Sequence, residues 1–295
     1  MPSDLKNYNS FCLPWRELPG AMPADIEIFA VGDVHGQAEL FARVLGEIRD
    51  TPHDEKVRHL VILGDLIDRG PASIEAVDLA MRAGELAAAD ELHVLHGNHD
   101  IAMMLSLEQP EHLDFWLLLG GGRVLSEAGV SVTESSWEEI TDVLKSVLHP
   151  DYLYAISSGP THLHLCDLLF VHAGICPQTN RDEFLGLSRR LIQIDDHWAT
   201  IRNSFLTHQG GWDHDDPDPI RRELNPTVVV HGHTPALRQD LTTADDLDIC
   251  DGVEGYRTVA LDIGAAYRTQ LAFAHFRSRA GKTEVQIRAV SAGNP

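Results

Sequence analysis

The sequence predicts an α/β fold in which two mixed β-sheets pack face to face as a sandwich flanked by helices. Apolar strands, polar loops and amphipathic helices alternate from Ile26 to about residue 100, which is typical of a parallel sheet. A mainly helical stretch of about 101–160 follows, and strand patterns then return from Thr161 to Val290. We therefore expect a second, more antiparallel sheet to pack against the first.

The first part of the chain repeats a strand–loop–helix unit three times. Its predicted strands are Ile26–Val31, His59–Leu63 and Leu92–Leu95. The helix predicted after the first strand places on one face the apolar residues Leu40, Phe41, Val44, Leu45 and Ile48. Gly64–Pro71 reads as a loop, and Ser73–Arg82 as the next helix. Loops at the carboxyl ends of parallel strands gather at one edge of the sheet, where α/β proteins place their sites.

The rest of the chain is predicted to complete one domain. Residues 1–24 contain four prolines and are expected to form an irregular arm, so the domain covers 25–295. The helical stretch, which includes the amphipathic segment Trp137–Leu148, is interpreted as an insertion or cap. Gly210–Asp218 has the composition of a loop. The later predicted strands are Thr161–Cys166, Leu168–Val171, Thr227–Val230, Arg257–Ile263, Gln270–Phe276 and Thr283–Val290.

Charge and cysteine content exclude several classes of function. The 295 residues include 23 basic and 45 acidic side chains, a net charge of −22, which would repel nucleic acids and anionic membranes. An acidic protein that binds phosphate needs local positive charge, and metal ions supply it. Four scattered cysteines disfavour a disulfide framework and a cysteine zinc site. With no signal-peptide pattern and no membrane-spanning stretch in the sequence, we expect a soluble cytoplasmic protein.

Five short loops place polar residues directly after apolar strands. Their glycines allow sharp turns or a close approach of the backbone to a ligand, and Asp, Asn and His side chains are suitable ligands for Mn, Fe or Zn. Each loop alone could be an ordinary turn, but the ordered set is specific. The five are Gly32-Asp33-Val34-His35-Gly36, Gly64-Asp65-Leu66-Ile67-Asp68-Arg69-Gly70, Gly97-Asn98-His99-Asp100, His172-Ala173-Gly174 and His231-Gly232-His233-Thr234.

This ordered set resembles the calcineurin-like metallophosphoesterases, and within them the bacterial and phage branch of the phosphoprotein phosphatases. Three further stretches are similar to that branch, namely Trp116-Leu117-Leu118-Leu119-Gly120-Gly121-Gly122, Gly232-His233-Thr234-Pro235 and Asp262-Ile263-Gly264-Ala265. The resemblance covers about residues 27–275. It implies two divalent metal ions, with manganese expected first and iron or zinc as alternatives. A hydroxide held by the metal pair would attack the phosphate directly.

The resemblance also implies a role for each matching residue. Asp33 and His35 would bind the first metal, Asp65 would bridge both, and the second would be held by Asn98, His172 and His233. His99 would protonate the leaving oxygen, with Asp68 holding its imidazole, and Arg69 would bind phosphoryl oxygens. Arg202 is our choice for a second phosphate-binding arginine, with Arg221 and Arg222 as alternatives in the same interval.

Simpler interpretations compete for several of these residues. The aspartates could cap helices or stabilise turns, but three carboxylates after buried strands need a counter-charge. His231, two residues before His233, is expected to be structural. His162, His164 and His275 are expected to be ordinary histidines in strands, and His214 to belong to a solvated acidic loop. Trp116–Gly122 is assigned to packing and a turn.

The function we expect is hydrolysis of phosphomonoesters, foremost phosphoserine and phosphothreonine in proteins. One alternative is symmetrical diadenosine tetraphosphate hydrolysis: Asp100 favours it, because protein phosphatases commonly carry Glu there, whereas Asp68 opposes it, because that branch typically has a small residue there. Another alternative is a binding module that has lost catalysis, and the complete ligand set argues against it. The expected partners are phosphoproteins or small phosphoesters, and the sequence does not predict an oligomeric state.

Overall fold

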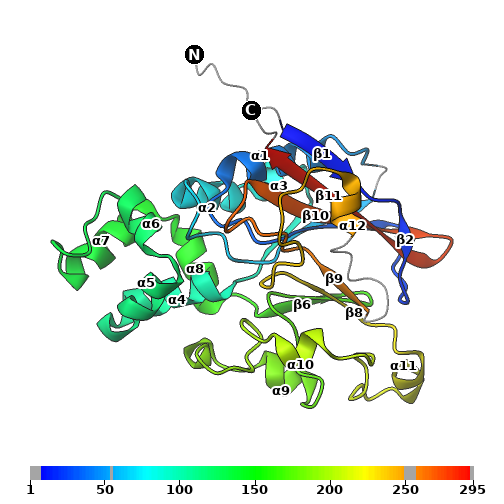
Figure 1. Cartoon of the computed structure of the whole chain (residues 1–295). Coiled ribbons are helices and arrows are strands. Elements are labelled where there is room, and N and C mark those ends of the chain that lie inside the picture. The colour runs from blue at the N-terminus through cyan, green and yellow to red at the C-terminus, as the bar shows by residue number, and fades with distance from the viewer. Residues whose placement is uncertain (1–7, 54–55, 249–256, 293–295) are drawn as a thin grey trace.

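The computed structural model describes residues 8–53, 56–248 and 257–292 (Figure 1). Within these residues it contains two β-sheets, as predicted. The larger sheet has the strand order β1 (Tyr8–Cys12), β11 (Lys282–Ala292), β10 (Gln270–Arg279), β3 (Ile26–Val31), β4 (Val57–Ile62) and β5 (Glu91–Val94), and β2 (Arg16–Glu17) also pairs with β11. The smaller sheet has the order β6 (His162–Leu165), β7 (Leu168–Val171), β8 (Val228–His231) and β9 (Thr258–Ala260).

The distribution of antiparallel pairs differs from the prediction. Strands β3, β4 and β5 are parallel, as expected. The long hairpin β10–β11, however, joins this larger sheet through antiparallel pairing of β10 with β3, and the smaller sheet is mainly parallel over β7, β8 and β9. The expectation of a more antiparallel second sheet is therefore wrong. β10 is buried on both faces along most of its length, and a central place between β11 and β3 satisfies that requirement.

The expectation of an irregular amino-terminal arm is wrong for its described part. Tyr8–Cys12 pairs antiparallel with β11 in an unbroken five-residue register, and Arg16–Glu17 makes a second short pairing with the same strand. Leu13, Leu18 and Met22 between and beyond these strands are buried. The prolines interrupt the strands without preventing them, because Pro is tolerated at the ends of edge strands. The arm is therefore part of the domain.

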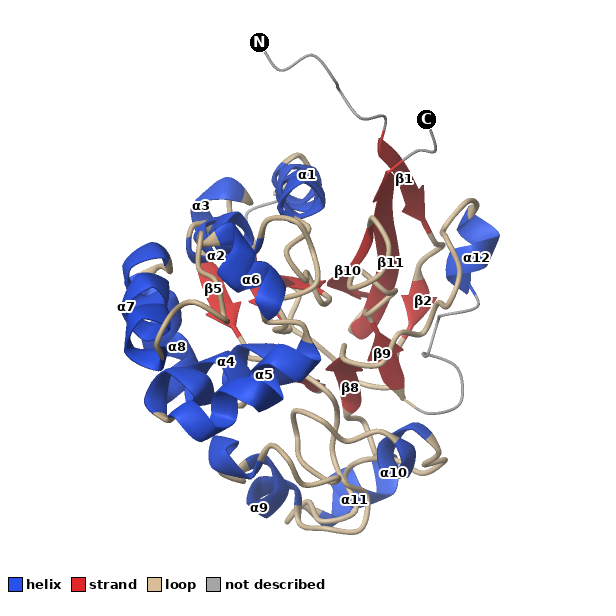
Figure 2. Ribbon diagram, turned by 60° about the vertical axis from the view of Figure 1, so that its left-hand side comes forward, coloured by secondary structure: helices blue, strands red, loops and turns tan. Residues whose placement is uncertain are grey.

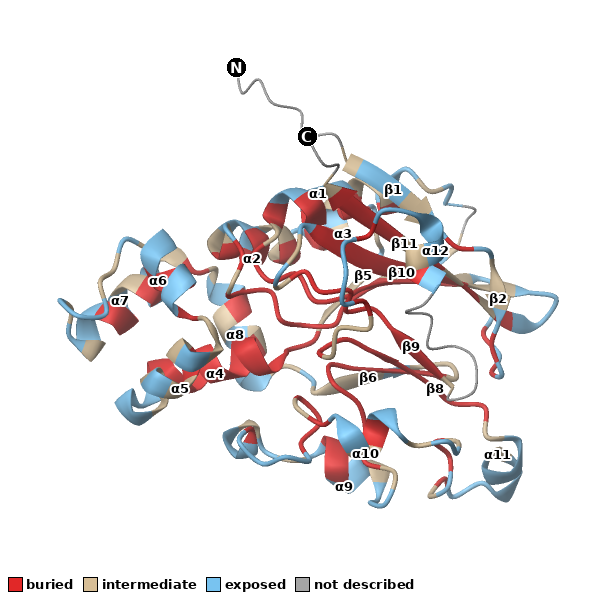
Figure 3. Ribbon diagram, viewed as in Figure 1, coloured by how far each residue is buried: buried red, intermediate tan, exposed pale blue. Residues whose placement is uncertain are grey.

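The larger sheet is buried on both faces by different partners. Phe29, Val31 and Ile62 belong to the apolar cluster on the helix-covered face. Ile28 and Ala30 alternate with them and pack into a second cluster, which includes residues from β7 and β8 of the smaller sheet. Alternate residues of a strand face opposite sides, and Figure 3 shows the resulting buried strands at the centre of the molecule. The predicted sandwich flanked by helices is confirmed.

Helices surround the two sheets (Figure 2). Those of the first half are α1 (Ala38–Arg49), α2 (Ser73–Met81), α3 (Ala83–Leu86), α4 (Asn98–Glu108), η1 (Pro110–His112), α5 (Leu113–Leu119), α6 (Gly122–Glu127), α7 (Trp137–Val147) and α8 (Pro150–Ser158). Helices α4 to α8 occupy the stretch for which the sequence predicts a helical insertion, and Figure 1 shows them gathered at one end of the molecule. The others are α9 (Arg181–Leu185), η2 (Arg189–Leu191), α10 (Asn203–Leu206), α11 (Pro219–Leu224) and α12 (Ala244–Asp248).

Strand ends from both sheets meet at one place. The main-chain N–H of Gly232, after β8, donates to the carbonyl of His172, after β7. The ring Nδ1 of His172 in turn lies 2.9 Å from the carbonyl oxygen of Leu63, after β4 in the other sheet. These contacts bring together three of the five polar loops, those after β4, β7 and β8. No helix in the described part of the chain is long and apolar enough to cross a bilayer.

Candidate metal centre and active site

The candidate metal ligands from both sheets lie together in a buried cluster. Asp65, in the loop after β4, is the central residue. Its Oδ2 lies 3.5 Å from His35 Nε2 and 3.4 Å from His172 Nε2. Asn98 Oδ1 lies 3.3 Å from His172 Nε2 and 2.8 Å from His233 Nδ1. Loops that are distant in sequence thus converge on one carboxylate and one amide.

Two groups of candidate donor atoms share Asp65. One consists of His35, Asp65 and His99, the other of Asp65, His172 and His233, and within each group the donor atoms lie within 4.8 Å of one another. Carboxylate oxygens with imidazole nitrogens suit Mn, Fe or Zn, so this donor set fits a pair of divalent cations bridged by Asp65. Asp33 is not in either group; its carboxylate accepts the main-chain N–H of His233 at 3.0 and 3.1 Å.

The backbone of the cluster is held in an uncommon conformation. His35, Asp65 and His233 have φ values of 44°, 48° and 65°, in the left-handed region that non-glycine residues seldom adopt. Two glycines next to candidate ligands leave no room for a side chain. A Cβ at Gly97 would lie 1.9 Å from Asp65 Oδ1, and a Cβ at Gly232 would lie 1.9 Å from Asp33 Oδ1. Such strain collects at functional sites.

Burial and neighbouring charges shift the pKa values of the cluster's carboxylates and imidazoles in different directions. Burial raises the pKa of Asp33 well above its ordinary value, and the nearby Asp262 raises it further. Burial opposes ionisation of Asp65, but the imidazoles of His172 and His99 outweigh it and hold its pKa well below the ordinary range. Burial likewise opposes protonation of His172, yet Asp65 raises its pKa to about 10. A bound divalent cation would take over the counter-charge that this imidazolium supplies.

A second set of contacts lies beside the candidate ligands. His99 Nδ1 lies 2.7 Å from Asp68 Oδ2, and both residues are buried. The opposite ring nitrogen, Nε2, faces the ligand cluster, 4.0 Å from Asp65 Oδ2. The main-chain N–H of His99 also donates to Asp65 Oδ1 at 3.0 Å. His99 therefore lies between Asp68 and the ligand cluster, with Nδ1 toward Asp68 and Nε2 toward Asp65.

Trp116 is a residue of this set that the sequence interpretation missed. Its indole Nε1 lies 3.1 Å from each carboxylate oxygen of Asp68, and the side chain is fully buried. The sequence assigned Trp116 to packing only. A chemical argument could have found this contact, because the N–H of a buried tryptophan needs a hydrogen-bond acceptor.

Asp100 organises the main chain around Asp65. Its carboxylate accepts the N–H groups of Asp65 at 2.8 Å, Leu66 at 3.2 Å and Gly97 at 2.9 Å. It also accepts the Tyr152 hydroxyl, from α8, at 2.6 Å. Burial raises the pKa of Asp100 to about 6. The sequence used Asp100 only to compare families and gave no role to Tyr152, because nothing in their spacing links them.

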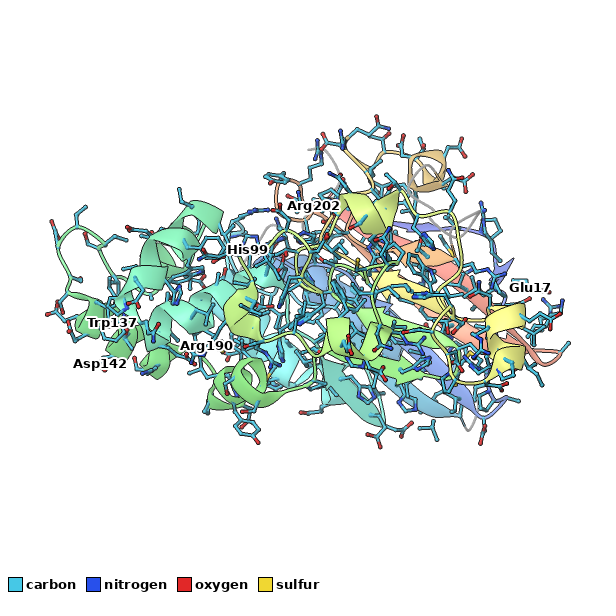
Figure 4. All side chains as sticks on the ribbon, turned by 90° about the horizontal axis from the view of Figure 1, so that it is seen from below. Glu17, His99, Trp137, Asp142, Arg190 and Arg202 are labelled. Atoms are coloured by element: carbon cyan, nitrogen blue, oxygen red, sulfur yellow. The ribbon has the colours of Figure 1, made fainter. Side chains whose placement is uncertain are left out.

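The candidate arginines separate into two groups. Arg202 Nε donates to His233 Nε2 at 3.0 Å, so Arg202 reaches the ligand cluster (Figure 4). Arg69 Nε donates to the carbonyl of Leu119 at 3.1 Å, and its guanidinium lies 5.2 Å from the ring centroid of Tyr267. Arg221 instead pairs with Asp167 and Asp216, and Arg222 donates to the carbonyl of Asp216. The structure therefore favours Arg202 over the two alternatives.

The remaining histidines have other partners. His231 Nδ1 lies 3.1 Å from the carbonyl oxygen of Gly232, and its ring packs edge-on against Phe205. His275 pairs with Glu27 at 3.1 Å. His162 and His164 are on β6, where His162 is half-buried and His164 exposed.

The acidic loop around His214 differs from the prediction. His214 itself is exposed, but Asp213 is fully buried and Asp216 is buried as well. Asp213 accepts the main-chain N–H and the hydroxyl of Thr227, and Asp216 pairs with Arg221. The expectation of a solvated acidic loop is therefore wrong, because Asp213 ties the loop to Thr227, directly before β8, and Asp216 ties it to α11 through Arg221.

Comparison with known proteins adds independent findings. The family model for calcineurin-like phosphoesterases matches residues 26–237. The chain is 26% identical over 217 residues to the asymmetrical bis(5'-nucleosyl)-tetraphosphatase PrpE of Anoxybacillus flavithermus, a match that covers 70% of this chain and 77% of that protein. It is 33% identical over 179 residues to the symmetrical bis(5'-nucleosyl)-tetraphosphatase of Nitrosococcus oceani, covering 55% of this chain and 61% of that one.

A solved structure has a similar fold. It is described as a "putative diadenosine tetraphosphatase", has 20% sequence identity and a TM-score of 0.50, and the match covers 89% of this chain and 97% of that chain. The family model covers all five polar loops, since its match begins at Ile26 and ends beyond His233. The cluster around Asp65 thus lies inside the region that this family shares.

Proposed function

The chain belongs to the calcineurin-like phosphoesterase family, and from this membership we propose that it removes phosphate from phosphoserine and phosphothreonine in proteins. The family makes the chain a metallophosphoesterase, which is a hydrolase of phosphate esters. The contact between His99 and Asp68 carries the narrower proposal. A serine or threonine alkoxide is a poor leaving group, and a positioned proton donor accelerates its departure by ~10²–10⁴-fold.

Six residues would hold two divalent cations, for which manganese is our first choice and iron or zinc the alternatives. Asp33, His35 and Asp65 would hold one cation, and Asp65 would share the other with Asn98, His172 and His233. Such a pair, when bound, supplies a nucleophile by lowering the pKa of water toward the neutral range, and it neutralises phosphate charge. Because water is the nucleophile in this proposal, the chain needs no catalytic Ser or Cys.

The chain's own residues would bind the phosphate and manage the proton. Arg202 and Arg69 would donate to the non-reacting phosphoryl oxygens, since guanidinium groups match a phosphate with paired N–H groups. Asp68 accepts from His99 Nδ1, so a proton carried by the opposite ring nitrogen, Nε2, would face the site. That proton would be transferred to the seryl or threonyl oxygen as the bond to phosphorus breaks.

A substrate panel tests the proposal directly. Purified chain supplied with manganese should release phosphate from phosphoserine and phosphothreonine peptides, while the Asp65→Asn variant should not. Diadenosine tetraphosphate is measured in the same series. Turnover of the dinucleotide alone would overturn the phosphoprotein proposal. Absence of hydrolysis for every member, including p-nitrophenyl phosphate, would favour a non-catalytic binding protein instead.

The second candidate is hydrolysis of dinucleoside tetraphosphates. The names of the two relatives, both bis(5'-nucleosyl)-tetraphosphatases, support it, and so does one surface feature. Tyr267 is 68% exposed beside Arg69, so its ring is accessible to a nucleobase while Arg69 binds phosphate. Stacking of a base on an aromatic side chain contributes ~1–3 kcal/mol.

A substitution at Tyr267 separates the two candidates. Tyr267→Ala should raise KM for diadenosine tetraphosphate by roughly 5-fold to 100-fold if a base stacks there. It should leave KM for a phosphoserine peptide without aromatic residues nearly unchanged. Tyr154→Ala is a matched control, because Tyr154 is another exposed tyrosine, at 72%. Equal effects of Tyr267→Ala on both substrates would argue against base stacking.

A further inference from the structure

Residues 116–127 contact the loop that carries Asp68 and Arg69 at two points and the start of α2 at a third. We call these residues the α5–α6 brace. At the first point, Trp116 Nε1 donates to both oxygens of Asp68, each at 3.1 Å. The acceptor of His99 is therefore held from two sides: the imidazole binds Oδ2, and the indole spans Oδ1 and Oδ2.

The second point of contact is Arg69. The carbonyl of Leu119 accepts Arg69 Nε at 3.1 Å. Gly120 follows with φ 123°, and a Cβ there would lie 3.0 Å from Arg69 Cγ. A side chain at this position would both strain the backbone and press on the arginine stem. The brace thus also sets the direction of a candidate phosphate-binding residue.

The third point of contact is the start of α2. Glu127 accepts the main-chain N–H groups of Ser73 at 2.7 Å and Ile74 at 3.0 Å, which a carboxylate at a helix amino terminus does favourably. The Ser73 hydroxyl accepts the main-chain N–H of Asp68 at 3.1 Å. The backbone of Asp68, which has the uncommon φ of 72°, is therefore tied to the same brace as its side chain.

The indole of Trp116 is itself fixed by a glycine. A Cβ at Gly121 would lie 2.4 Å from Trp116 Cε2, so the main chain after α5 lies directly on the ring. Two of the glycines in the Leu119-Gly120-Gly121-Gly122 turn therefore have separate uses, one against Arg69 and one against Trp116. Packing alone would require a large apolar ring here, but it would not require an N–H aimed at a carboxylate.

We propose that the α5–α6 brace is a positioning element for proton donation, in which Trp116 orients Asp68 and thereby the ring of His99. This inference rests on the proposed phosphoesterase function. Without the indole N–H, Asp68 Oδ1 has no other hydrogen-bond donor among the described contacts, so the carboxylate can rotate about its remaining bond to His99. The imidazole would then spend less time directed at the leaving oxygen.

The test is Trp116→Phe, which removes the N–H and keeps an aromatic ring. Turnover of phenyl phosphate, whose phenolate is a poor leaving group, should fall by ~10-fold to 100-fold. This is the range expected for loss of a hydrogen bond to a charged group. Turnover of p-nitrophenyl phosphate, whose leaving group needs little protonation, should fall far less. Metal content by elemental analysis should match wild type. Equal losses on both substrates, or no loss on either, would overturn the inference.

Trp137→Phe is the matched control. Trp137 lies in α7, and its Nε1 donates to the carbonyl of Ser106 at 2.7 Å, so this variant also removes one indole hydrogen bond from the helical region. Figure 4 shows Trp137 at the far end of these helices from His99. Its ratio of phenyl to p-nitrophenyl turnover should equal that of wild type. A ratio that shifts as much as in Trp116→Phe would mean that general loosening of the helices is responsible.

A double-mutant cycle decides whether Trp116 acts through Asp68. In an Asp68→Asn background, Trp116→Phe should no longer change the ratio of turnovers, because the carboxylate that it orients is gone. An undiminished effect in that background would contradict the inference.

A proton resonance gives a readout that does not depend on turnover. In zinc-loaded protein with isotope-labelled histidine, the His99 Nδ1–H signal is identified by its loss in His99→Ala. It should shift or broaden in Trp116→Phe and stay in place in Trp137→Phe. An unshifted signal would refute the positioning role even in an active enzyme. Conversely, a shifted signal in a chain that hydrolyses none of the phosphate esters would support positioning while refuting the proposed function.

Discussion

The two sides of the candidate site are built differently. On the ligand side, which we define as Asp33, His35, Asp65, Asn98, His172 and His233, buried carboxylates and imidazoles oppose one another in an uncommon backbone conformation. On the helical side, formed by α5, α6 and α8, the indole of Trp116 donates to Asp68 and the hydroxyl of Tyr152 donates to Asp100. The ligand side thus offers groups of donor atoms that could hold cations, whereas the donors of Trp116 and Tyr152 on the helical side already have carboxylate acceptors.

This difference predicts two kinds of response to substitution. Removal of a ligand leaves a metal position incomplete, so binding and turnover should fail together. Removal of a contact on the helical side changes only the orientation of a side chain near the site. Turnover should therefore fall only partially, and the metal should stay bound. The substitutions below test that separation, from the largest expected effect to the smallest.

Asp65→Asn should have the largest effect. Asp65 belongs to both groups of candidate donor atoms, so this variant should lose more than ~100-fold in affinity for both cations and nearly all turnover. Elemental analysis after dialysis measures the metal, with p-nitrophenyl phosphate for activity. Asp142→Asn is the control, because Asp142 is exposed and distant from His99 in Figure 4. Full occupancy of both positions in Asp65→Asn would refute the bridging role.

His99→Ala should rank next and should separate metal from proton transfer. We expect metal content near that of wild type and a loss of ~10²–10⁴-fold on phenyl phosphate, with a much smaller loss on p-nitrophenyl phosphate. A parallel loss on both substrates would argue against His99 as the acid. Loss of metal would place His99 among the ligands, a possibility that its 4.0 Å distance from Asp65 leaves open.

Arg202→Ala should reduce activity less than His99→Ala does. Loss of its contacts to phosphoryl oxygens should raise KM by ~10-fold to 100-fold, with metal retained. Steady-state kinetics on a phosphopeptide and inhibition by inorganic phosphate measure the change. Arg190→Ala is the matched control, because Arg190 pairs with Glu108 at the surface. An unchanged KM in Arg202→Ala would contradict a phosphate-binding role for Arg202.

The same comparison shows what the sequence could predict. Ligand-side residues follow apolar strands within a few positions, so strand patterns alone place Asp33, Asp65 and Asn98 at one sheet edge, and the sheet order of the first half follows. Trp116 and Tyr152 reach the site from helices through contacts that span 48 and 52 residues. No periodicity specifies such distances. They depend on how α5 and α8 pack, which local sequence does not determine.

The same limit explains the errors in the fold. Tyr8–Cys12 has too few apolar residues to predict a strand, and its strand character depends on the partner β11, which lies almost 280 residues later. The two strands of the hairpin β10–β11 are predicted from the sequence. Which sheet they join depends on which strand offers an unpaired edge, and here that strand is β3. Asp213 reads as a loop residue by composition, and only its contact with Thr227 buries it.

Tyr152→Phe should have the smallest effect and is the strictest test of the helical side. It removes one of four donors to Asp100 while the three main-chain donors keep the loop around Asp65 in place. We expect a loss of about 1–3 kcal/mol in the free energy of unfolding, a few-fold fall in turnover and unchanged metal content. Tyr154→Phe, on the same helix but 72% exposed, should change none of these in denaturant titrations and kinetic assays. If Tyr152→Phe emptied a metal position, then the helical side would contribute to holding the cations, and the separation between the two sides would fail.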